Sequence, residues 1–528
     1  MNPPLSALIS SIDSVAVRGF EERRILSLEY DSRKVVHGSM FFAFPGLHAD
    51  GHDFIGAAIC GGAAAVVHEK PLSEYRQEVC YIQVEDARRA MSPAAAAFHG
   101  RPSRSLRVLG VTGTEGKSTT VSLIYQLLNL AGEKTGFFST VNSDDGTGEK
   151  PNPEHQTTPE ATTVHRLLAA MRDSGCLNAV VESSSHGLSP RTGRLEDVDF
   201  DAAVFTNVTH EHLEFHGTWE QYRLDKSRLF SALDRTGHLK DLGGMGLEVP
   251  SFGVVNADDP SAGFFASKTE KPVYSYSAQG REANLSAQGI ESDSQGSSFS
   301  IQGTMGGLQA VRNARINLPG QFNVGNSLAA LAAASALLGR PWTDFLDFLP
   351  ALRPVKGRMT RIDQGQPFEL IVDYAHTPSS FEAVLPPLRS RIQGRIICLF
   401  GSGGERDREK RPLQGKVAAQ YCDILVLADE DPRGERPMDI LEEIASGCPR
   451  LSRGESLFLI PDRKAAIRKA FSLAGDSDLV LLLGKGHENS IIYADRVMPY
   501  DEIGEAVEAL GEMGYGNRHG QGGAQNDA

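Results

Sequence analysis

The stretch GVTGTEGKSTT, residues Gly110–Thr120, decides the fold of the middle of the chain. It overlaps the apolar run RVLGVTG (107–113), which predicts a buried strand entering a glycine-rich turn. A helical pattern follows and ends near Gly132, with four residues on one face: Val121, Ile124, Tyr125 and Leu128. A strand, a glycine turn and a helix in this order present backbone N–H groups and a helix N-terminus to phosphates.

Two residues of this turn have the side chains of a nucleotide-binding loop. Lys117 would neutralise the β- and γ-phosphates, and the Ser118 hydroxyl could reach a Mg²⁺ ion. The spacing differs from G-x-x-x-x-G-K-[ST], because Val111 stands where the first glycine should be. The flanking strand and helix nevertheless argue against a chance Gly-Lys-Ser turn, and we predict that the loop binds ATP.

The length and composition of the chain limit the function classes. Its 528 residues correspond to about three domains of typical size. Hydrophobic residues make up 40% and charged residues 23%, as in ordinary globular proteins. With 53 Lys and Arg against 67 Asp and Glu, the formal net charge is -14. This balance argues against nucleic acid as the main partner, because phosphate backbones favour clustered basic residues.

The cysteines and the N-terminus point to the cytoplasm. The six cysteines contain no C-x-x-C pair, so we expect reduced, buried thiols and no zinc site. The first residues, MNPPLSALISSIDSV, lack the basic and apolar regions of a secretory signal. No stretch approaches the roughly 18 apolar residues that cross a bilayer. We expect a soluble cytoplasmic protein with no membrane span.

Short apolar runs alternate with helical patterns, which predicts an α/β fold with largely parallel sheets. Further strands are expected at 179–182, 202–206, 253–256, 370–373, 396–400, 424–427 and 479–483. We also expect linkers at 99–105 and 339–358 and an antiparallel flap, rich in Ser, Gly and Gln, at 277–309. The polar, glycine-rich end of the chain is expected to be disordered.

Several predicted strands run into polar loops, where ligands bind in open α/β sheets. VESSSHGL (181–188) places Glu182 at a strand end, and TNVTHEHLEFHG (206–217) contains three histidines and two acids. Glu182 with one of these histidines would suit a divalent ion beside the phosphates. A Ser- and His-rich surface loop is the alternative. No G-x-S-x-G elbow frames the serines, which disfavours a Ser–His hydrolase.

Four later loops also follow predicted strands: IVDYAHTP (371–378), FGSGGERDREKRP (400–412), DEDPRGE (429–435) and LGKGHE (483–488). Arg406 and Arg433 lie in these loops, where a planar guanidinium favours recognition of a carboxylate. For Arg408, Glu409 and Lys410 we prefer the start of a solvated helix of mixed charge.

Eleven motifs in order resemble the Mur ligases of peptidoglycan synthesis: GVTGTEGKST, QTTPE, VESSSHGL, FTNVTHEHLEFHG, YRLDKSRLF, LPGQFNVGN, VKGRM, VDYAHTP, GSGGERDREKRP, DEDPR and GKGHE. Within that family the chain resembles the MurE type, which adds a diamino acid to UDP-N-acetylmuramoyl-L-alanyl-D-glutamate. The resemblance runs from DSRKV near residue 31 to GKGHE near residue 488. Folylpolyglutamate synthetase shares the nucleotide loop but not the DSR, HADG and DxPR elements together.

The resemblance implies a fold of three α/β domains. We expect a UDP-binding domain at 1–102, a central P-loop-type ATPase domain with a mostly parallel sheet at 103–345 and a Rossmann-like, amino-acid-binding domain at 346–515, followed by a disordered tail at 516–528. It further implies a monomeric, ATP-dependent ligase that uses Mg²⁺. Its expected substrates are UDP-N-acetylmuramoyl-L-alanyl-D-glutamate and a diamino acid, which is meso-diaminopimelate, L-lysine or L-ornithine.

The motifs also carry the family's site residues onto this sequence. The resemblance implies contacts to ATP from Gly113, Thr114, Glu115, Gly116, Lys117, Ser118, Thr119, Asn323, Asn326, Arg358 and Asp373. Contacts to the UDP-muramoyl dipeptide are expected from Ser32, Leu47, His48, Ala49, Thr157, Thr158, Ser184 and Arg194. Contacts to the diamino acid are expected from Arg406, Glu430, Asp431, Pro432, Arg433, Gly484 and Glu488. The expected catalytic residues are Lys117, Glu182, His212 and Lys226, and the expected metal ligands are Ser118, Glu182, His212 and carbamylated Lys226.

Two of these assignments depend on the family pattern. In the family an arginine lies eight residues after the position of Ser184, and this chain has Thr192 there. The segment RTGRL is two residues longer here than in the family pattern, so Arg194 is the expected equivalent of that arginine. Lys226 resembles a lysine that is carbamylated in the family, which turns a cation into an anion able to hold a second Mg²⁺. Sequence alone favours a lysine on a helix surface.

Three positions depart from the family pattern. Glu115 replaces an asparagine beside Lys117, and Glu211 replaces an aspartate. Glu430-Asp431-Pro432-Arg433 stands where diaminopimelate-adding enzymes have Asp-Asn-Pro-Arg. Arg433 could hold the distal carboxylate of diaminopimelate, whereas the charge of Asp431 suits the free ammonium of lysine or ornithine. The diamino acid, the role of Glu115 and the carbamylation of Lys226 therefore stay open.

The sequence thus predicts a ligase that forms an amide bond through an acyl phosphate. One alternative is another ATP-dependent amino-acid ligase of the same superfamily, of the polyglutamate-adding type. Another is a catalytically silent nucleotide-binding module. Loss of a catalytic residue would favour the silent module, and all four are present: Lys117, Glu182, His212 and Lys226.

Overall fold

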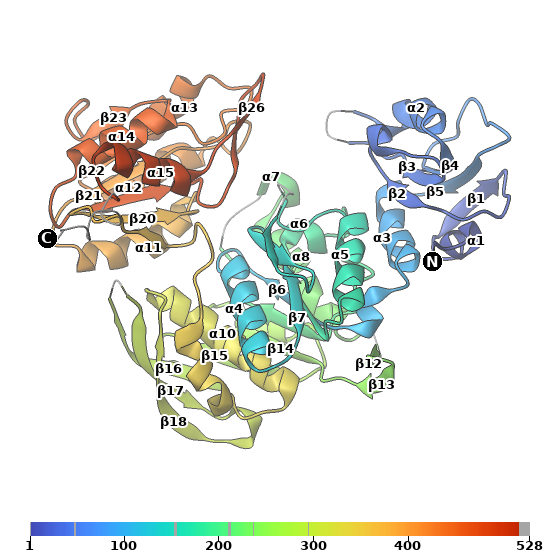
Figure 1. Cartoon of the computed structure of the whole chain (residues 1–528), viewed down its shortest axis with the longest axis horizontal. Helices are drawn as coiled ribbons and strands as arrows, with labels where there is room; N and C mark the ends of the chain where they lie inside the picture. The colour runs from blue at the N-terminus through green and yellow to red at the C-terminus, as the bar shows by residue number, and fades with distance from the viewer. Residues whose placement is uncertain are drawn as a thin grey trace, which may run out of the picture. The chain divides into compact units, whose positions relative to one another are not determined.

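The structure of the protein is a computed structural model (Figure 1). The chain divides into two compact units. The structure describes residues 2–46, 49–152, 156–209, 213–235, 237–293 and 295–516, with Leu213 and Glu214 as backbone only. The first unit comprises 1–290, 298–316 and 323–352, and the second 291–297, 317–322 and 353–528. The three predicted domain boundaries stay predictions. Among the described residues no helix has both the length and the apolar character needed to cross a membrane.

The first unit begins with a five-stranded sheet in the order β1-β5-β4-β3-β2. Its strands are β1 (Ser14–Arg18), β2 (Ser27–Glu29), β3 (Ser39–Phe42), β4 (Ala63–His68) and β5 (Cys80–Val84), and only β1 is antiparallel to its neighbour. Helices α1 (Leu5–Ile9), α2 (Ile55–Cys60) and α3 (Ala87–Phe98) accompany it. Leu5 and Met91 pack with strand residues such as Ile82, which fixes α1 and α3 on this sheet.

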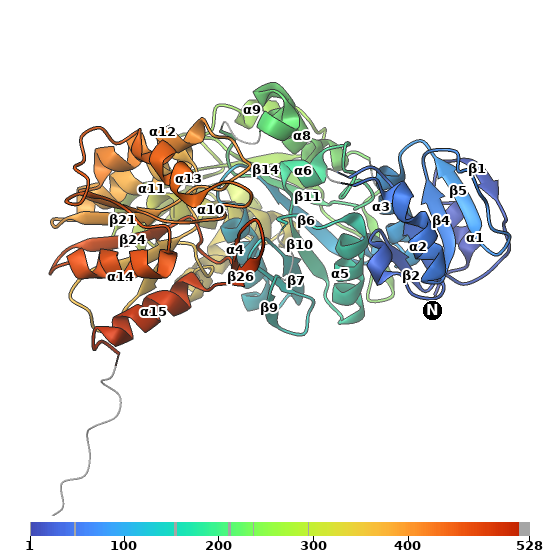
Figure 2. The same cartoon turned by 90° about the horizontal axis from the view of Figure 1, so that it is seen from above.

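A larger sheet forms the middle of the first unit. Its parallel part has the order β15-β14-β11-β6-β10-β7, from β15 (Val273–Ser277), β14 (Phe252–Asn256), β11 (Ala202–Phe205), β6 (Arg107–Thr112), β10 (Asn178–Glu182) and β7 (Thr135–Phe138). Figure 2 shows most of these strands side by side. Helices α4 (Lys117–Leu130), α5 (Ala161–Asp173), α6 (Ser185–Leu188), α7 (Leu213–His216), α8 (Trp219–Ala232), α9 (Ala262–Ala266) and α10 (Gln321–Leu338) accompany the sheet. Because the strands are buried on both faces, their sequences read as continuous apolar runs.

Short strands extend the sheet at both edges and form a separate hairpin. β8 (Asn142–Asp144) and β9 (Glu149–Pro151) add an antiparallel edge to β7. β16 (Leu285–Ser292), β17 (Ser297–Gly303) and β18 (Ala310–Ile316) extend the other edge, and β16 pairs with β15 in parallel. The region 277–309, expected as an antiparallel flap, thus joins the central sheet through a parallel pairing and continues as strand to Ile316. The hairpin β12 (Leu239–Leu242) and β13 (Met245–Glu248) was not expected. Its buried Lys240 forms an ion pair with Asp201 at 2.7 Å.

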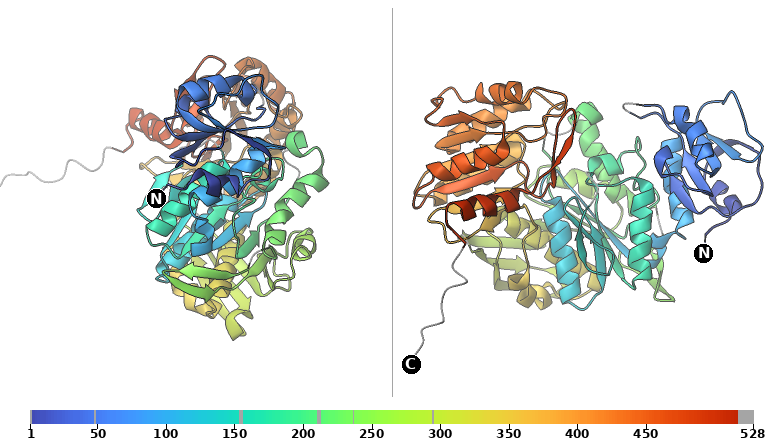
Figure 3. Two further views of the ribbon diagram at one scale, coloured as in Figure 1. Left: turned by 90° about the vertical axis from the view of Figure 1, so that its right-hand side faces the viewer. Right: turned by 45° about the horizontal axis from the view of Figure 1, so that its top comes forward.

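The second unit contains a six-stranded sheet in the order β19-β20-β24-β21-β22-β23. Its strands are β19 (Thr360–Ile362), β20 (Glu369–Asp373), β21 (Ile396–Phe400), β22 (Ile424–Leu427), β23 (Leu457–Leu459) and β24 (Leu479–Leu483), and only β19 is antiparallel. Helices α11 (Pro378–Arg391), α12 (Lys410–Tyr421) and α13 (Pro437–Ala445) share one core cluster, and α14 (Arg463–Leu473) and α15 (Glu502–Glu512) share another. Figure 3 shows helices on both sides of this sheet, in orange and red. A hairpin of β25 (Ser490–Ile492) and β26 (Val497–Pro499) follows β24.

These elements confirm the predicted α/β class with mostly parallel sheets. Each strand expected from an apolar run is present, and the five-residue runs IICLF and LVLLL are β21 and β24 at the predicted bounds. The helix predicted after the glycine turn is α4, which ends at Leu130 before Gly132 at a φ of 86°. The expected linkers contain short 3-10 segments, Pro102–Ser105 and Trp342–Ala351. The predicted tail lies outside the described residues from residue 517 onward.

All six cysteines are free, as predicted, but they differ in exposure. Cys60 is exposed at the end of α2, whereas Cys80, Cys176, Cys398, Cys422 and Cys448 are buried. Burial raises the pKa values of Cys80, Cys176 and Cys448 to about 11. Five of the six thiols therefore match the expectation of buried, inert groups, and Cys60 does not.

Candidate active site

The glycine-rich loop connects the end of β6 to the first turn of α4. A Cβ atom on Gly113 would lie 1.9 Å from Thr206 Oγ1, so only glycine allows the loop to pass this close to the end of β11. Gly116 has a φ of 80°, and a Cβ there would lie 2.6 Å from Asn326 Oδ1 on α10. The loop is thus held between two neighbouring elements at the N-terminus of α4, where backbone N–H groups can bind a phosphate group.

The side chains expected at the phosphates lie at this loop. Lys117 Nζ donates to the carbonyl of Thr114 at 2.6 Å, folded back over its own loop. The Ser118 hydroxyl lies 3.0 and 2.9 Å from the two carboxylate oxygens of Glu182, which ends β10. Thr140 donates its N–H to the same carboxylate at 2.7 Å and its hydroxyl at 3.0 Å. Ser118 and Glu182, predicted as metal ligands from distant parts of the sequence, are therefore neighbours.

These oxygen donors fit a hard divalent cation. Glu182 is 1% exposed, and Mg²⁺ is bound in proteins by one or two carboxylates together with hydroxyl and phosphate oxygens. Within the described ranges no group of three His, Cys, Asp or Glu side chains is placed to hold a metal. The third predicted protein ligand, His212, lies outside the described residues.

Lys226 lies at the loop, not on a helix surface, so the interpretation from sequence alone is wrong. Its side chain, on α8, is 1% exposed, and Nζ donates to the carbonyl of Gly113 at 2.6 Å. The ammonium lies 4.5 Å from the centre of the Tyr222 ring, and the Tyr222 hydroxyl contacts Thr114 Oγ1 at 3.1 Å. Helical spacing places Tyr222 and Lys226 on one face of α8, which turns toward the phosphate loop.

A buried pair beside Lys226 was not predicted. Asp225 Oδ2 lies 2.8 Å from His216 Nδ1, and both side chains are buried. Burial alone would raise the pKa of Asp225, but hydrogen bonds from His216 and Gln221 lower it below its usual value. The pair joins α7 to α8 next to Lys226. His216 and Asp225 belong to the FHG and LDK motifs of the sequence, but no spacing rule connects the two motifs.

The residues expected at the muramoyl dipeptide meet at the end of β10. Thr158 Oγ1 donates to the carbonyl of Glu182 at 2.9 Å and accepts the N–H of Ser184 at 3.0 Å. Arg194 donates to the carbonyl of Thr158 at 2.8 Å and to Glu160 Oε1 at 2.7 Å. Thr192, at the usual family spacing, instead donates to the carbonyl of Ser189 at 3.2 Å. Arg194 rather than Thr192 thus lies with Thr158 and Ser184.

The remaining contacts to this substrate are predicted in the N-terminal sheet. Ser32 begins a short 3-10 turn whose preceding residue, Asp31, accepts the N–H of Arg33 at 3.0 Å. Ala49 is exposed, and Leu47 and His48 lie outside the described residues. Thr157 is half-buried beside Thr158.

The residues expected at adenine and ribose are divided between the two units. In the first unit, Asn323 and Asn326 are buried on α10, and Asn326 Oδ1 accepts the Thr120 hydroxyl at 3.2 Å. In the second, Asp373 ends β20 and accepts the N–H groups of Met359 and Ala375, each at 2.7 Å. The Arg358 guanidinium lies 4.5 Å from the centre of the Tyr374 ring.

The structure holds Glu115 by its backbone. Its N–H donates to Asn207 Oδ1 at 2.8 Å, and its carbonyl accepts the Thr206 hydroxyl at 2.6 Å. These bonds fix the loop conformation whatever residue occupies position 115, which explains why the departure from asparagine is compatible with the fold.

The residues expected at the diamino acid gather where β21, β22 and β24 end. Arg433, at a φ of 51°, donates to the carbonyl of Gly404 at 2.9 Å, near Arg406. A Cβ on Gly484 would lie 2.9 Å from Glu430 Oε2, so the loops after β22 and β24 are in close contact. Pro432 is buried, and its carbonyl would lie 1.9 Å from a Cβ on Gly404.

Lys485 changes the electrostatics of this cluster and was not predicted. Its buried ammonium lies 2.9 Å from Asp431 Oδ1 and 2.5 Å from Glu488 Oε2. Asp431 also accepts the N–H of Ile492 at 3.0 Å. Asp431 Oδ2 also lies 3.6 Å from Arg433 Nη2. The negative charge that Asp431 adds, relative to asparagine, is therefore met by Lys485 and Arg433 together and does not by itself favour a cationic substrate. The GKGHE motif contained this lysine, but its pairing could not be deduced from spacing.

Arg463 holds the two loop-bearing strands together. It begins α14 after the N-cap residue Asp462, and its guanidinium donates to the carbonyls of Asp429 (3.1 Å) and Leu483 (2.7 Å). Glu502, on α15, receives two further bonds at 2.9 and 2.6 Å, and both side chains are fully buried. Tyr500 donates its hydroxyl to the same carboxylate. Asp429 and Leu483 directly precede the predicted diamino-acid loops.

Asp429 gives the first prediction, which concerns pH. Burial raises its pKa to about 6, although the Tyr493 hydroxyl, at 3.0 Å, and the charge of Arg463 act in the opposite direction. In the unfolded chain the pKa returns to near 3.8, so the ionised carboxylate destabilises the native state above pH 6. We expect Asp429→Asn to raise the free energy of unfolding of the second unit by about 1 to 3 kcal/mol at pH 8.

This advantage of the variant should shrink as the pH falls from 6 to 4, because the wild-type carboxyl then becomes protonated. Urea unfolding of both proteins at several pH values measures the difference. If the difference in unfolding free energy between the two proteins does not change with pH, the raised pKa of Asp429 is contradicted.

Three family models match consecutive parts of the chain. "Mur ligase family, catalytic domain" matches residues 24–99, "Mur ligase middle domain" residues 111–334 and "Mur ligase, glutamate ligase domain" residues 357–486.

Sequence relatives match over nearly the whole length. The UDP-N-acetylmuramyl-tripeptide synthetase of Treponema denticola is 52% identical and covers 96% of this chain and 97% of its own. The protein of that name from Roseiflexus is 46% identical, covering 93% and 96%. The UDP-N-acetylmuramoyl-L-alanyl-D-glutamate–2,6-diaminopimelate ligase of Geobacillus kaustophilus is 39% identical, covering 97% and 100%.

Solved structures agree in fold. A UDP-N-acetylmuramoyl-L-alanyl-D-glutamate–2,6-diaminopimelate ligase has a TM-score of 0.60 at 28% identity, covering 93% of this chain and 96% of its own. The MurF ligase from Thermotoga maritima, solved in complex with ADP, has a TM-score of 0.61 at 18% identity, covering 92% and 97%. The second likeness concerns the fold alone.

Proposed function

The chain belongs to the Mur ligase family of ATP-dependent, amide-forming enzymes, and on that premise we propose that it adds a diamino acid to UDP-N-acetylmuramoyl-L-alanyl-D-glutamate in peptidoglycan synthesis. One observation carries the proposal. Glu182 connects the Ser118 hydroxyl of the phosphate loop, through its carboxylate, to Thr158 through its carbonyl. The residues proposed for ATP and for the peptide thereby lie on the two sides of one strand end.

In the first proposed step, an oxygen of the D-Glu γ-carboxylate attacks the γ-phosphorus of ATP. The bond to the β-phosphate oxygen breaks, giving an acyl phosphate and ADP. Two anions must approach each other, so positive charge at the phosphates is the main requirement. Lys117 supplies one such charge from the N-terminus of α4. Arg194, bonded to Thr158, orients the peptide end of the substrate.

Mg²⁺, held by Ser118 and Glu182 with His212 and a carbamylated Lys226, would supply further positive charge at the phosphates. Carbamylation needs Lys226 Nζ in its neutral form.

In the second proposed step, the neutral amine of the diamino acid attacks the acyl carbon and inorganic phosphate leaves, with one proton released. Arg406, Glu430, Arg433, Gly484 and Glu488 are proposed to hold the amino acid at the strand ends of the second unit. Since both Lys485 and Arg433 lie at Asp431, neither meso-diaminopimelate nor L-lysine nor L-ornithine is favoured by charge at position 431 alone.

We place this reaction in the cytoplasm, where ATP and UDP-linked precursors are available, and expect a monomer. The alternatives weighed from sequence, a polyglutamate-adding ligase and a silent nucleotide-binding module, are less consistent with the three relatives described above. Two of these are tripeptide synthetases, and the third is a diaminopimelate ligase.

Phosphate release is the direct test. With ATP and Mg²⁺ we expect release only when both UDP-N-acetylmuramoyl-L-alanyl-D-glutamate and one of meso-diaminopimelate, L-lysine or L-ornithine are present, and a tripeptide product by mass spectrometry. Omission of each component in turn is the control. No turnover with any of the three amino acids, from protein that is folded and binds ATP, would overturn the proposal. Release with a folate substrate would support the polyglutamate-adding alternative.

A further inference from the structure

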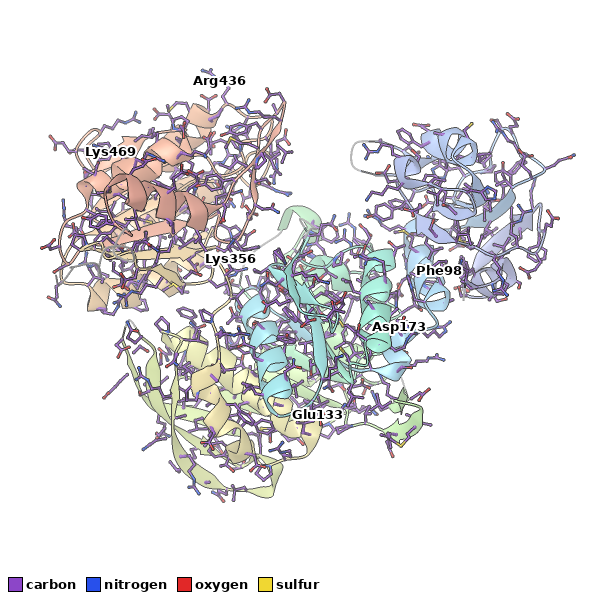
Figure 4. All side chains as sticks on the ribbon, viewed as in Figure 1. Phe98, Glu133, Asp173, Lys356, Arg436 and Lys469 are labelled. Atoms are coloured by element: carbon purple, nitrogen blue, oxygen red, sulfur yellow. The ribbon has the colours of Figure 1, made fainter. Side chains whose placement is uncertain are left out.

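Arg88 shares a buried carboxylate with a residue already assigned to the substrate. Its Nη2 lies 3.3 Å from Glu160 Oε1, the same oxygen that accepts Arg194 Nη2 at 2.7 Å. Glu160 is 6% exposed, and its second oxygen has no hydrogen-bond partner among the described residues. Arg88 comes from α3 and Glu160 from the residue before α5. These two helices lie side by side, with their ends at Phe98 and Asp173 marked in Figure 4.

The contacts of the described residues leave an excess of positive charge at this point. Two guanidinium groups, of Arg88 and Arg194, face the single carboxylate of Glu160 in a partly buried place. Such an excess is costly unless an anion completes it, because charges removed from water need a partner. The longer of the two contacts, at 3.3 Å, belongs to Arg88, whose side chain is still 32% exposed. If Arg88 served only to hold α3 against α5, we would expect its contact with Glu160 to be short and fully buried.

Arg88 also lies between the two ends of the proposed substrate site. Its guanidinium lies 4.8 Å from the centre of the Phe44 ring, and the rings of Phe44 and Tyr30 are 6.4 Å apart. Both aromatic residues are close in sequence to predicted uridine contacts, Ser32 and Ala49. On its other side, through Glu160, Arg88 reaches Arg194 and Thr158, which are proposed to contact the peptide.

From this position we propose that Arg88 is a further substrate-binding residue, one that contacts an anionic group of the UDP-muramoyl dipeptide. The inference rests on the proposed function. Two groups of this substrate have the required chemistry: the diphosphate between uridine and sugar, and the α-carboxylate of D-Glu, which does not react. A guanidinium can form two parallel hydrogen bonds to either of them.

The test compares Arg88→Met with Arg89→Met. Arg89 is the next residue of α3, and it pairs with Glu196 at 2.9 Å without reaching Glu160 in the described contacts. We expect Arg88→Met to raise the KM for the nucleotide peptide by about tenfold to a hundredfold, as for loss of a charge-assisted hydrogen bond. The KM values for ATP and the amino acid, and kcat, should stay within about twofold of wild type. Arg89→Met should leave all of them unchanged.

Calorimetric binding separates the two anionic groups. Weaker binding of UDP to Arg88→Met identifies the diphosphate. Unchanged binding of UDP and of UDP-N-acetylmuramoyl-L-alanine, with weaker binding of the full dipeptide substrate, identifies the D-Glu carboxylate. Equal binding of all three to wild type and Arg88→Met would overturn the inference, as would a lower melting temperature with unchanged KM, which would mark a purely structural role.

If Arg88→Met does not fold, Arg88→Lys tests whether Arg88 binds the substrate. It keeps the charge but loses the bidentate geometry, and an unchanged KM and unchanged binding would then overturn the inference. Failure of the proposed function gives a different result, since wild type itself would show no turnover with any of the three amino acids. In that case the comparison of UDP binding to wild type and to Arg88→Met would still test whether Arg88 contacts the diphosphate.

Discussion

Replacing Lys117 with methionine should lower kcat for phosphate release by about a hundredfold to a thousandfold, the usual effect of removing one preorganised group that stabilises transition-state charge. Methionine has a similar length and no charge. Lys117 donates to the carbonyl of Thr114 at 2.6 Å, a neutral partner that a phosphate oxygen can replace. Because the charge acts mainly as two anions approach, kcat should fall more than the KM values rise. Steady-state assays at saturating substrates measure this.

Lys134→Met is the matched control. Lys134 directly precedes β7, a strand of the same central sheet, and donates to the carbonyl of Ser174 away from the glycine loop. Its kcat should stay within about twofold of wild type, as for an ordinary surface change. If Lys117→Met keeps more than a tenth of wild-type kcat while its circular dichroism and melting temperature are unchanged, Lys117 is not the phosphate-neutralising residue.

Replacing Arg463 with methionine should destabilise the second unit by about 3 to 5 kcal/mol, the range for removing one partner of a buried ion pair. Glu502 would then be left fully buried without its cation, and the carbonyls of Asp429 and Leu483 would lose a donor. For a unit of this size, such a loss lowers the melting temperature by roughly 6 to 20 °C. Calorimetry on the whole chain, following the transition of the second unit, measures it.

Arg468→Met provides the comparison on the same helix. Arg468 forms an ion pair with Glu512 across the same two helices, α14 and α15, but at the surface, and such pairs contribute about 0 to 1 kcal/mol. Adding Glu502→Gln to Arg463→Met should restore part of the lost stability, since the unpaired charge is then removed. If Arg463→Met and Arg468→Met lower the unfolding free energy equally, burial of the pair of Arg463 and Glu502 does not make it more stabilising than a surface pair.

The sequence was most informative where one local pattern determines the structure. Continuous apolar runs such as LVLLL and IICLF gave β24 and β21 at their observed bounds, because strands buried on both faces need no alternation. The glycine loop was recognisable because it requires a strand before it and a helix after it. Glu182 could be placed at a strand end, and the topology of a parallel sheet then brought it to the phosphate loop.

The sequence was least informative where function depends on pairing between distant charges. Lys226, Lys485 and Arg463 each occur in a stretch that fits an exposed helix or loop, and all three side chains are buried. Lys226 donates to a loop carbonyl, and Arg463 bonds two strand ends and Glu502. Lys485 pairs with Asp431 of another loop and with Glu488 of its own loop. Apart from the pair of Lys485 and Glu488, these contacts have sequence separations that no periodic pattern encodes. Burial of a charge follows from the assembled fold and not from the local sequence.

The hairpin of β12 and β13 shows the same limit. Its buried Lys240 pairs with Asp201 at the start of β11, yet LKDLGGMGLE contains too few apolar residues to predict strands. The Gly-Gly pair at 243–244 was the available signal, since it is a typical hairpin turn.

The distribution of the cysteines has a practical consequence for spectroscopy. Because Cys60 is the one exposed thiol of the six, a maleimide dye at neutral pH should label the N-terminal sheet at a single position without any substitution. Arg436→Cys, at an exposed residue of the second unit, would add an acceptor site. Fluorescence energy transfer between the two dyes would then report how the distance between the units changes as each substrate is added.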